Sequence, residues 1–253
     1  MKISIVTAVF NRAGTIADAL RSVDTQSYQN IEHIIQDGGS QDGTLEIIRQ
    51  FGTSSAQVVS EPDGGIYDAI NKGISRATGD IIGLMHSDDF FADELVMERV
   101  VEAFRDPGVD GVYGDLDYVS ARNTDKIVRR WRSGPYHPDL LERGWMPPHP
   151  TLYLRREVFD RWGLYDTSMR IAADYEAMLR YLAKGDIRLA YIPEVLVKMR
   201  VGGESNRSLS RILQKSREDY IALRRYGVGG MGTLMAKNFS KLEQFLPRKG
   251  IPK

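Results

Sequence analysis

The first hundred residues alternate between two hydrophobic patterns, and this alternation constrains the fold more than any other feature. Four short apolar runs rich in β-branched residues predict buried strands: "ISIVTAVF", "IEHIIQ", "AQVVSE" and "GDIIGLMH". Between these runs, apolar residues recur at helical spacing: Ile16, Ala19, Leu20 and Val23; Leu45, Ile47 and Ile48; Ile66, Ala69, Ile70 and Ile74. Strands that alternate with helices of this length predict an α/β fold of βαβ units around a mostly parallel sheet.

The ends of these four strands carry most of the residues that can do chemistry: Phe10 and Asn11, Asp37, Glu61 to Asp63, and Asp88 with Asp89. Right-handed crossovers place the carboxyl ends of parallel strands at one edge of a sheet, where open α/β folds bind ligands. Each acid also has a purely structural explanation. Asp37 could open a Gly-rich turn, and the adjacent pair could cap the helix that begins near Asp93. Their convergence favours a ligand site in one crevice.

The stretch "SDDFF" places two carboxylates, Asp88 and Asp89, side by side. Adjacent carboxylates repel each other unless they face water or share a cation. Mg²⁺ and Mn²⁺ take carboxylate oxygens and leave coordination positions open for substrate phosphates. The pair therefore predicts a divalent metal that neutralises the charge of a departing nucleoside diphosphate. One carboxylate would bind the metal, and the other would accept a hydrogen bond from a sugar hydroxyl.

Several other classes of function are excluded by what the sequence does not contain. There is no cysteine, which excludes disulfides and thiolate metal sites. No GxxxxGK[ST] or HExxH motif occurs, which argues against a P-loop NTPase and a zincin protease. The glycines of "DGGSQDG", which follow the second predicted strand, lack the GxGxxG spacing of the dinucleotide-binding fold. A Ser hydrolase is not supported, because no GxSxG motif occurs.

The pattern changes after Asp110. The runs "GVYGDLDYVS" and "KIVRRWR" predict two longer strands around a turn, and a Pro-, His- and Trp-containing loop follows over residues 132–150. The run "ADYEAMLRYLAKG" predicts a helix that ends at Gly185. The run "IRLAYIPEVLVKMR" predicts a pair of strands.

The last segment, residues 207–253, is predicted to be a basic amphipathic helical tail. It contains 11 Lys and Arg but 3 Asp and Glu, a net charge of +8, although the whole chain has a net charge of zero. One apolar stripe runs along it: Met231, Leu234, Met235, Phe239, Leu242, Phe245 and Leu246. Such a tail favours peripheral binding to an anionic membrane surface, and the alternative is that the stripe packs on the body of the protein.

The N-terminal apolar run is too short for a secretory signal, and no run approaches the roughly 18 apolar residues of a membrane span. We therefore expect a cytoplasmic protein that can lie on the inner face of the cell membrane. Nothing in the sequence points to nucleic acid as a partner, and the oligomeric state is left open.

The motifs together resemble the inverting family 2 glycosyltransferases with the GT-A fold. The resemblance runs from residue 2 to about residue 205 and rests on "SIVTAVFNR", "DGGSQDGT", "EPDGGIYDAINKGISRATGDIIGLMHSDD" and "AADYEAMLR". Within the family, "DGGIYDAINKG" is similar to a subset that assembles bacterial exopolysaccharide, capsule or O-antigen. The resemblance implies a GT-A domain over residues 1–206, with a nucleotide-sugar-binding half (1–115) and an acceptor and catalytic half (116–206).

The resemblance also implies roles for individual residues. Ala8 and Phe10 would lie beside the base, and Asp37 would accept a hydrogen bond from it, usually from uracil. Asp63 and Lys72 would lie near the nucleotide and its diphosphate. Asp88 would face the ribose, and Asp89 would ligate Mn²⁺ or Mg²⁺.

On the acceptor side, the resemblance implies that Asp174 is the catalytic base. It would take the proton of an acceptor hydroxyl as that oxygen attacks the anomeric carbon, which inverts the configuration. His149, Trp145 and Arg200 are candidates for contact with the acceptor or the diphosphate. Structural explanations stand beside these roles: an acid at a helix N-terminus for Asp174, a packed loop histidine for His149, and loop packing for Trp145 with Tyr136.

The predicted function is metal-dependent transfer of a sugar from a nucleotide sugar, with UDP favoured, to a saccharide acceptor. The acceptor is expected to be lipid-linked, in the synthesis of a bacterial surface polysaccharide. Two alternatives stay open. A sugar-phosphate nucleotidyltransferase would need a Gly-rich basic loop where this chain has "FNRAGT". A non-catalytic sugar-nucleotide-binding subunit is suggested by Ala173, where the family usually has Glu before the catalytic Asp.

Overall fold

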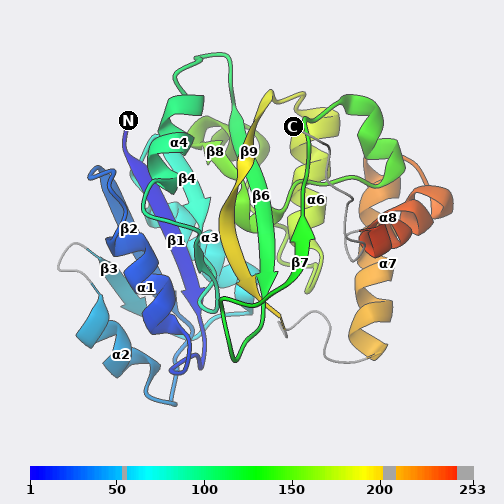
Figure 1. Cartoon of the computed structure of the whole chain (residues 1–253). Helices are drawn as coiled ribbons and strands as arrows, with labels where there is room; N and C mark the ends of the chain where they lie inside the picture. The colour runs from blue at the N-terminus through cyan, green and yellow to red at the C-terminus, as the bar shows by residue number, and fades with distance from the viewer. Residues whose placement is uncertain (53–55, 202–208, 244–253) are drawn as a thin grey trace.

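The computed structural model describes residues 1–52, 56–201 and 209–243. The described residues form one nine-stranded sheet (Figure 1). Its order is β3 (Gln57–Ser60), β2 (Ile31–Asp37), β1 (Ile3–Val9), β4 (Ile81–Leu84), β8 (Tyr153–Arg155), β6 (Gly111–Val119), β9 (Leu189–Arg200) and β5 (Phe90–Phe91), and β7 (Ile127–Trp131) pairs with β6.

The first four strands of this order are parallel, because β1 pairs in parallel with both β2 and β4, and β2 pairs in parallel with β3. Beyond β4 the sheet is mixed. The short β8 is antiparallel to both of its neighbours, β6 and β9 are parallel, and β5 is antiparallel to β9. The predicted α/β fold with a mostly parallel sheet flanked by helices is confirmed.

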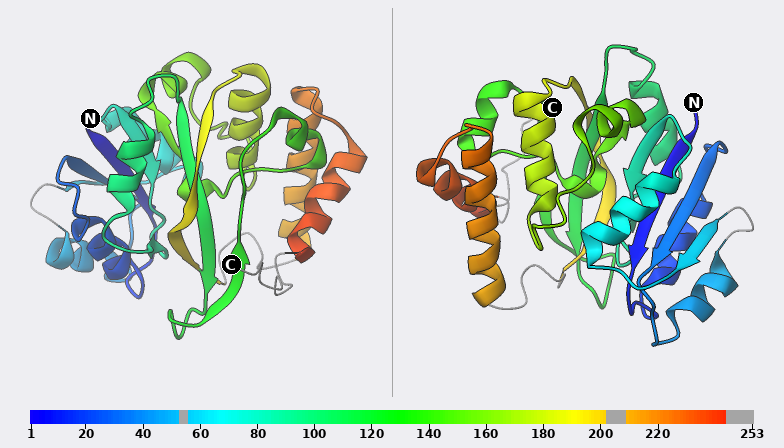
Figure 2. Two further views of the ribbon diagram at one scale, coloured as in Figure 1. Left: turned by 45° about the horizontal axis from the view of Figure 1, so that its top comes forward. Right: turned by 180° about the vertical axis from the view of Figure 1, so that it is seen from behind.

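Helices cover both faces of the sheet (Figure 2). On one face, α1 (Ile16–Asp24), α2 (Thr44–Phe51) and α4 (Val96–Ala103) contribute to one hydrophobic core. On the other face, α3 (Ile66–Arg76), α5 (Arg156–Trp162) and α6 (Ala173–Leu179) contribute to a second core. The helical spacing read from the sequence corresponds to these contacts, since Ile16, Ala19, Leu20 and Val23 are all buried.

The second half of the chain agrees with the predicted hairpin of β6 and β7, and α6 continues through one π-helical turn at Arg180–Lys184. Two short 3₁₀ helices, Pro138–Arg143 and His149–Thr151, lie in the predicted loop. The predicted strand pair after Gly185 is wrong, because residues 189–200 form the single strand β9. The register of β9 against β6 shifts within this strand. Ile192 lies opposite Gly114, but the next residue of β6, Asp115, lies opposite Val195. This bulge lets the strand pass Pro193, which has no N–H to donate.

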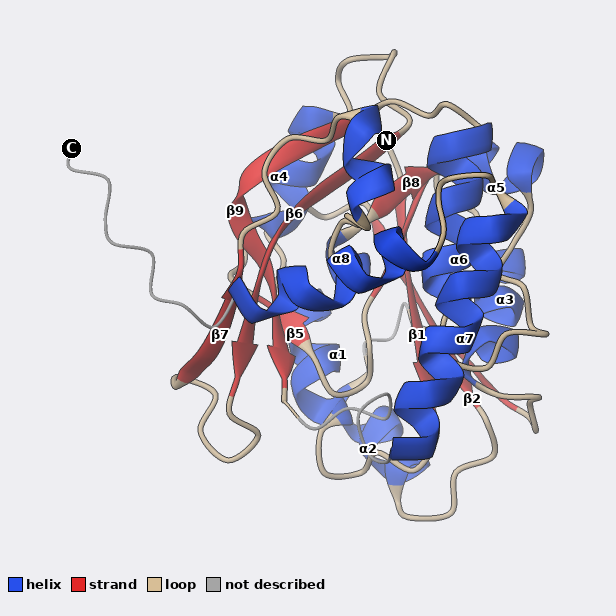
Figure 3. Cartoon of the chain, turned by 90° about the vertical axis from the view of Figure 1, so that its right-hand side faces the viewer, coloured by secondary structure: helices blue, strands red, loops and turns tan. Residues whose placement is uncertain are grey.

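The C-terminal segment folds into α7 (Leu209–Arg225) and α8 (Met231–Glu243). Figure 3 shows α7 beside α6, with α8 crossing nearby. Ala222, Leu223, Val228 and Leu234 are buried in the same core as α6. The helical prediction therefore holds for residues 209–243, and residues 207, 208 and 244–253, including Phe245 and Leu246, lie outside the described residues.

Glu32 joins three parts of the parallel sheet. Its buried carboxylate accepts hydrogen bonds from Lys2 and Ser4 of the β1 segment and from Thr78 and Gly79 ahead of β4. Burial alone would raise the pKa of Glu32, but these donors outweigh it and lower the pKa from 4.5 to about 2. A carboxylate with a lowered folded-state pKa adds stability above pH 4.5 that is lost as the pH falls towards 2.

We therefore expect Glu32→Gln to destabilise the protein by ~1–3 kcal/mol at pH 7, because buried donors lose a charged acceptor. The difference between variant and wild type should shrink as the pH falls from 4.5 towards 2, because the wild-type carboxylate then becomes protonated. Urea unfolding across this pH range measures both effects. Glu46→Gln, on the exposed face of α2, is the matched control. A pH-independent difference would contradict this account of Glu32.

Candidate functional site

The strand ends predicted to converge do lie together. In the parallel register, Asp37 at the end of β2 lies between Val9 of β1 and Ser60 of β3. Phe10 follows Val9 directly, and the segment that carries Asp63 follows Ser60. The carboxyl ends of β1, β2 and β3 therefore form one edge, at the bottom of Figure 1.

Asp37 is buried at this edge, and its two carboxylate oxygens differ in their hydrogen bonds. Its Oδ2 accepts hydrogen bonds from the N–H groups of Gly39 and Ser40, both at 3.0 Å, and from the hydroxyl of Ser60 at 2.6 Å. Its Oδ1 is buried and has no hydrogen-bond partner among the residues that the structure describes. A buried acceptor without a donor is costly, so this oxygen is suited to a donor from a ligand.

Phe10 and Asp63 flank the backbone next to Asp37. A Cβ atom on Gly38 would lie 2.3 Å from Oδ2 of Asp63 and 3.4 Å from the ring of Phe10, so a side chain here would displace the Asp63 carboxylate. The Phe10 side chain is 56% exposed, which leaves a ring face available for stacking. Ala8 is placed differently, because its side chain is buried in the core under α3.

Lys72 of α3 lies near this edge, where it contacts neighbouring groups of the protein. Its Nζ donates to the carbonyl of Pro62 at 3.0 Å and lies 3.4 Å from Glu61 and 3.5 Å from Asp68. The lysine thus holds the segment that carries Asp63. Its predicted role towards the diphosphate stays a prediction.

Asp88 and Asp89 lie in the turn between β4 and β5. The side chain of Asp89 is buried, and its Oδ1 accepts a hydrogen bond from the N–H of Arg200 at 3.0 Å. Arg200 also donates to the carbonyl of Asp88 at 2.7 Å and pairs with Asp18. The guanidinium of Arg200 is therefore a brace for this turn in the structure, and its predicted contact with acceptor or diphosphate stays a prediction.

The carboxyl group of Asp89 has the properties of a metal ligand. Its Oδ2 is buried and has no hydrogen-bond partner within the described part of the chain. Burial, followed by repulsion from Asp88, raises the pKa of Asp89 well above its usual range, so a nearby cation is needed to keep this group charged. No group of three or more His, Cys, Asp or Glu side chains among the described residues could hold a metal. An ion here would need ligands from a substrate as well.

The explanation of the acidic pair as a helix cap does not hold. The residue that accepts a hydrogen bond ahead of α4 is Asp93, whose Oδ1 receives the N–H of Leu95 at 2.9 Å. Asp88 and Asp89 are thus available for another role.

Asp174 lies in the first turn of α6, and two side chains from elsewhere in the chain meet its carboxylate. The hydroxyl of Tyr67 is 3.2 Å from Oδ1, and Nδ1 of His149 is 3.2 Å from Oδ2. The same hydroxyl donates to the carbonyl of Ile171 at 2.8 Å. The ring of His149 also packs edge-on against His86, with centroids 5.2 Å apart. His149 therefore lies beside Asp174, and its predicted contact with the acceptor or the diphosphate stays a prediction.

The surroundings of Asp174 keep its carboxyl group ionised at neutral pH. Burial alone would raise the pKa of Asp174, but nearby positive charges, that of His149 in its protonated form and those of Lys215 and Lys237, outweigh burial and lower it. Burial lowers the pKa of His149. At neutral pH the pair therefore consists of a carboxylate and a neutral imidazole.

Trp145 lies in an aromatic cluster of its own loop. Its ring stacks on Tyr136 with centroids 5.2 Å apart and meets Tyr113 edge-on at 5.6 Å. Its Nε1–H donates to the carbonyl of Ser133 at 3.3 Å. These contacts match the packing explanation considered for Trp145, and its contact with a sugar stays a prediction.

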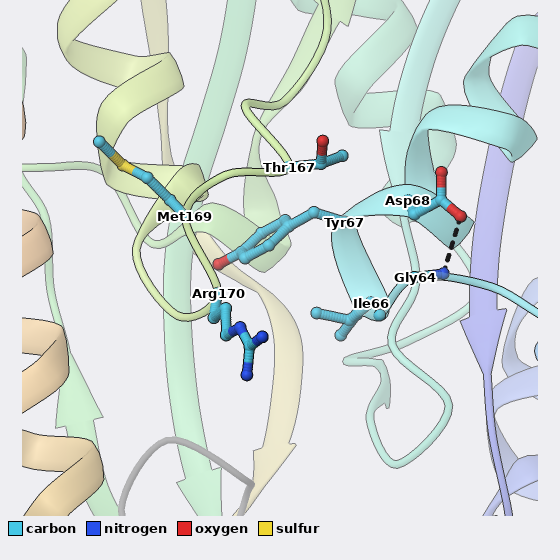
Figure 4. Close-up of a pocket in the computed structure, with 8 residues that line it drawn as sticks. Gly64, Ile66, Tyr67, Asp68, Thr167, Met169 and Arg170 are labelled. Carbon is cyan, nitrogen blue, oxygen red and sulfur yellow. Dashed lines mark hydrogen bonds between the residues drawn. The ribbon is translucent and has the colours of Figure 1, made fainter.

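A cavity of about 350 Å³ opens beside Tyr67 (Figure 4). It is lined by Gly64, Gly65, Ile66, Tyr67, Asp68, Thr167, Met169 and Arg170. No role was predicted for Tyr67, although it lies within a motif that supports the family resemblance, and none was predicted for Thr167 or Arg170. The tyrosine could have been found, since it lies within "DGGIYDAINKG"; no motif marks the other two.

No helix in residues 1–52, 56–201 and 209–243 has the length and apolar character needed to cross a membrane.

Comparisons with known proteins agree with the geometry. The sequence profile described as "Glycosyl transferase family 2" matches residues 4–171. The uncharacterized glycosyltransferase Rv1514c of Mycobacterium tuberculosis is 34% identical over 184 residues, which cover 70% of this chain and 68% of that protein.

Two solved structures share the fold at low identity. S. aureus TarS 1-349 in complex with UDP-GlcNAc has a TM-score of 0.68 at 17% identity, over 90% of this chain and 66% of that one. The mannosyltransferase PcManGT from Pyrobaculum calidifontis, in complex with GDP-Man and Mn²⁺, has a TM-score of 0.66 at 18% identity, over 96% of this chain and 70% of that one. These are GT-A glycosyltransferases. The chain therefore belongs to glycosyl transferase family 2 and is a glycosyltransferase.

Proposed function

We propose that this enzyme transfers a sugar from a nucleotide sugar, with UDP favoured, to a hydroxyl of a saccharide acceptor, with inversion at the anomeric carbon. The observation that carries the proposal is the carboxylate of Asp174, which is charged at neutral pH and lies against His149 and Tyr67. Family membership supports this activity over a nucleotidyltransferase or a non-catalytic binding subunit.

The donor is proposed to bind at the edge formed by Phe10, Asp37 and Asp63. The free Oδ1 of Asp37 suits an N–H donor such as the imide of uracil, and the exposed ring of Phe10 suits stacking on a base. Two relatives by fold are named as complexes with UDP-GlcNAc and with GDP-Man. Asp88, next to the metal ligand, is proposed to face the ribose.

We propose Asp89 as the protein ligand of Mn²⁺ or Mg²⁺, because its Oδ2 is buried and unpaired within the described residues and its pKa is raised. When bound, the ion would neutralise the diphosphate as the nucleotide departs. Arg200 would hold the Asp88–Asp89 turn in place through the two hydrogen bonds described above.

In the proposed reaction, Asp174 accepts the proton of the acceptor hydroxyl while the acceptor oxygen forms a bond to the anomeric carbon. The bond from that carbon to the diphosphate oxygen breaks, and its electron pair leaves with the nucleotide. His149 in its Nδ1–H tautomer would donate to Oδ2 of Asp174 and thus orient the carboxylate. One displacement converts an α-linked donor into a β-linked product.

The acceptor is proposed to enter through the cavity beside Tyr67. Asp68, Thr167 and Arg170 offer polar groups for sugar hydroxyls on its wall, and the Tyr67 hydroxyl connects the cavity to Asp174. A lipid-linked saccharide of a bacterial surface polysaccharide remains our proposal for the acceptor.

Peripheral binding to the membrane is also proposed, through one face of α8. The predicted stripe is divided in the structure: Leu234 is buried, whereas Met231, Met235 and Phe239 are 59%, 53% and 61% exposed. These three side chains are spaced four residues apart and so share one face. Lys215 and Lys237 are paired with the buried Asp219, so the attraction to an anionic surface would come from the other cations.

Replacement of Asp174 by Asn should lower kcat by about 10²–10⁴-fold, because an amide cannot take the acceptor proton. Donor binding should be retained, since the residues proposed to contact the nucleotide are Phe10, Asp37 and Asp63. Steady-state sugar transfer and nucleotide binding measure the two effects. Asp160→Asn, on the exposed face of α5, is the control. Unchanged transfer in Asp174→Asn would contradict the assignment of the base.

UDP with Mn²⁺ should raise the melting temperature, because a ligand at 100 times its Kd adds about 2.7 kcal/mol. With EDTA in place of Mn²⁺ the shift should be smaller, and Asp89→Asn should lose the dependence on metal. A thermal-shift panel of UDP, GDP, CDP and dTDP measures this. A metal-independent shift in the wild type would argue against the metal site, and a larger shift with GDP would change the proposed donor.

The triple variant Met231→Ser/Met235→Ser/Phe239→Ser should float with anionic liposomes at least tenfold less than the wild type, because it removes apolar area from the proposed membrane face. Truncation is not a clean test, since Leu234 and parts of α7 belong to the core. Val58→Ser on β3, at the opposite end of the sheet, is the control for an exposed apolar residue. Equal flotation of all three proteins would exclude this face as the contact.

A further inference from the structure

The segment that leads into α6 is held by a residue from α7. The carboxylate of Glu218 accepts the N–H groups of Arg170 at 3.2 Å, Ile171 at 2.8 Å and Ala172 at 2.9 Å. The amide of Gln214 also donates to it, at 2.9 Å. These backbone groups immediately precede Asp174.

Such a cap is normally supplied by the residue at the helix start. Here that residue is Ala172, which has no side-chain hydrogen-bonding group, and Ala173 follows it. The family usually has an acid directly before the catalytic Asp. In this chain a buried acid reaches the same segment from 46 residues further along the sequence. The position of the backbone that carries Asp174 therefore depends on a side chain of α7.

A second group of charges from the same two helices lies behind Asp174. Lys215 and Lys237 each lie 2.8 Å from the carboxylate of Asp219, and the side chains of Lys237 and Asp219 are only 2% exposed. The Nζ of Lys237 also lies over the ring of Tyr175, 2.9 Å from its centroid. Tyr175 is the neighbour of Asp174 in the sequence.

Buried ion pairs of this kind are a poor source of stability, because their desolvation offsets much of their attraction. Well-packed apolar side chains would hold two helices as well. The cluster does, however, contact the residue next to Asp174, because Lys237 lies over the ring of Tyr175. The charge of Lys215 also helps to lower the pKa of Asp174, whereas burial and Lys215 lower the pKa of Lys237 itself.

Helix α8 also meets the loop that carries His149. A Cβ atom on Gly144, which has a φ of +74°, would lie 2.8 Å from the backbone N of Lys237. The loop and the helix backbone therefore touch directly. The loop that carries His149 therefore contacts α8, and the segment that carries Asp174 is held by α7.

We propose that α7 and α8 form part of the catalytic site, with Glu218, Lys215, Asp219 and Lys237 as positioning residues for Asp174. Glu218 fixes the backbone ahead of Asp174, and the Lys–Asp–Lys cluster holds the following residue, Tyr175, and places Lys215 near the carboxylate. This inference rests on the proposed function, in which Asp174 is the base.

Other titratable groups also face Asp174, and their contributions have to be kept constant in the test. They are Tyr67, Tyr165, His86 and His149. Substitutions confined to α7 and α8 leave these four side chains unchanged. A change in the pH dependence of kcat therefore reports the contribution of the lysines.

The decisive variant is Lys215→Met, because this side chain is partly exposed and the substitution keeps its length. Loss of the charge should raise the pKa of Asp174, and so move the acid limb of the pH profile of kcat upward by about one pH unit. Lys215→Arg should restore the wild-type profile. Arg217→Met, an exposed position on the same helix, is the matched control and should behave as the wild type.

A second pair of variants tests the cap. Glu218→Ala should lower kcat about tenfold with little change in the KM of the donor, and Glu218→Gln, which keeps one acceptor oxygen, should recover part of the loss. UDP binding by thermal shift should be retained in both.

The outcomes separate this inference from the proposed function. If Asp174→Asn abolishes transfer but Lys215→Met keeps the wild-type kcat and pH profile, α7 and α8 only pack on the domain and the inference is wrong. If Asp174→Asn keeps its activity, the assignment of the base itself fails. An upward shift of the acid limb of the kcat profile in Lys215→Met, together with a wild-type profile in Lys215→Arg, would establish the role of the cluster.

Discussion

The pairing of β1 with β2 on one side and β4 on the other is the constraint on which the rest of the molecule depends. Because these strands are parallel and in register, Phe10, Asp37 and the turn after β4 all reach one edge. The Glu32 carboxylate fixes the opposite end of the same strands. The position of each polar group at the edge therefore follows from backbone pairing, and local loops add only the final orientation.

Three buried carboxylates of the candidate site have different hydrogen-bond partners and different neighbouring charges. Asp37 has donors on one oxygen, Asp89 has a raised pKa that favours a cation, and Asp174 has positive neighbours that keep it charged. Burial opposes ionisation in Asp89 and Asp174, and the partner of each group decides the result. Residues of one type can thus have opposite pKa shifts, which suits the metal ligand and the base that we propose.

The sequence allowed the parallel half to be predicted well, because hydrophobic periodicity and turn residues are local signals. It was less informative where contacts are distant in the chain. The bulge at Pro193 looked like a break between two strands, since sequence alone does not show a strand pairing past it. Glu218 was missed because nothing in its local pattern distinguishes it from a solvated helix residue. Lys215 and Lys237 were counted only as charges of a basic tail.

The order of the chain has a consequence for how the enzyme matures during synthesis. The residues proposed to contact the nucleotide base, Phe10, Asp37 and Asp63, are made early, whereas Arg200, which braces the Asp88–Asp89 turn, is made much later. The surroundings of Asp174 are complete only when α8 has docked with Lys237 beneath Tyr175. A nascent chain would therefore complete the proposed donor contacts before it completes the surroundings of the proposed base.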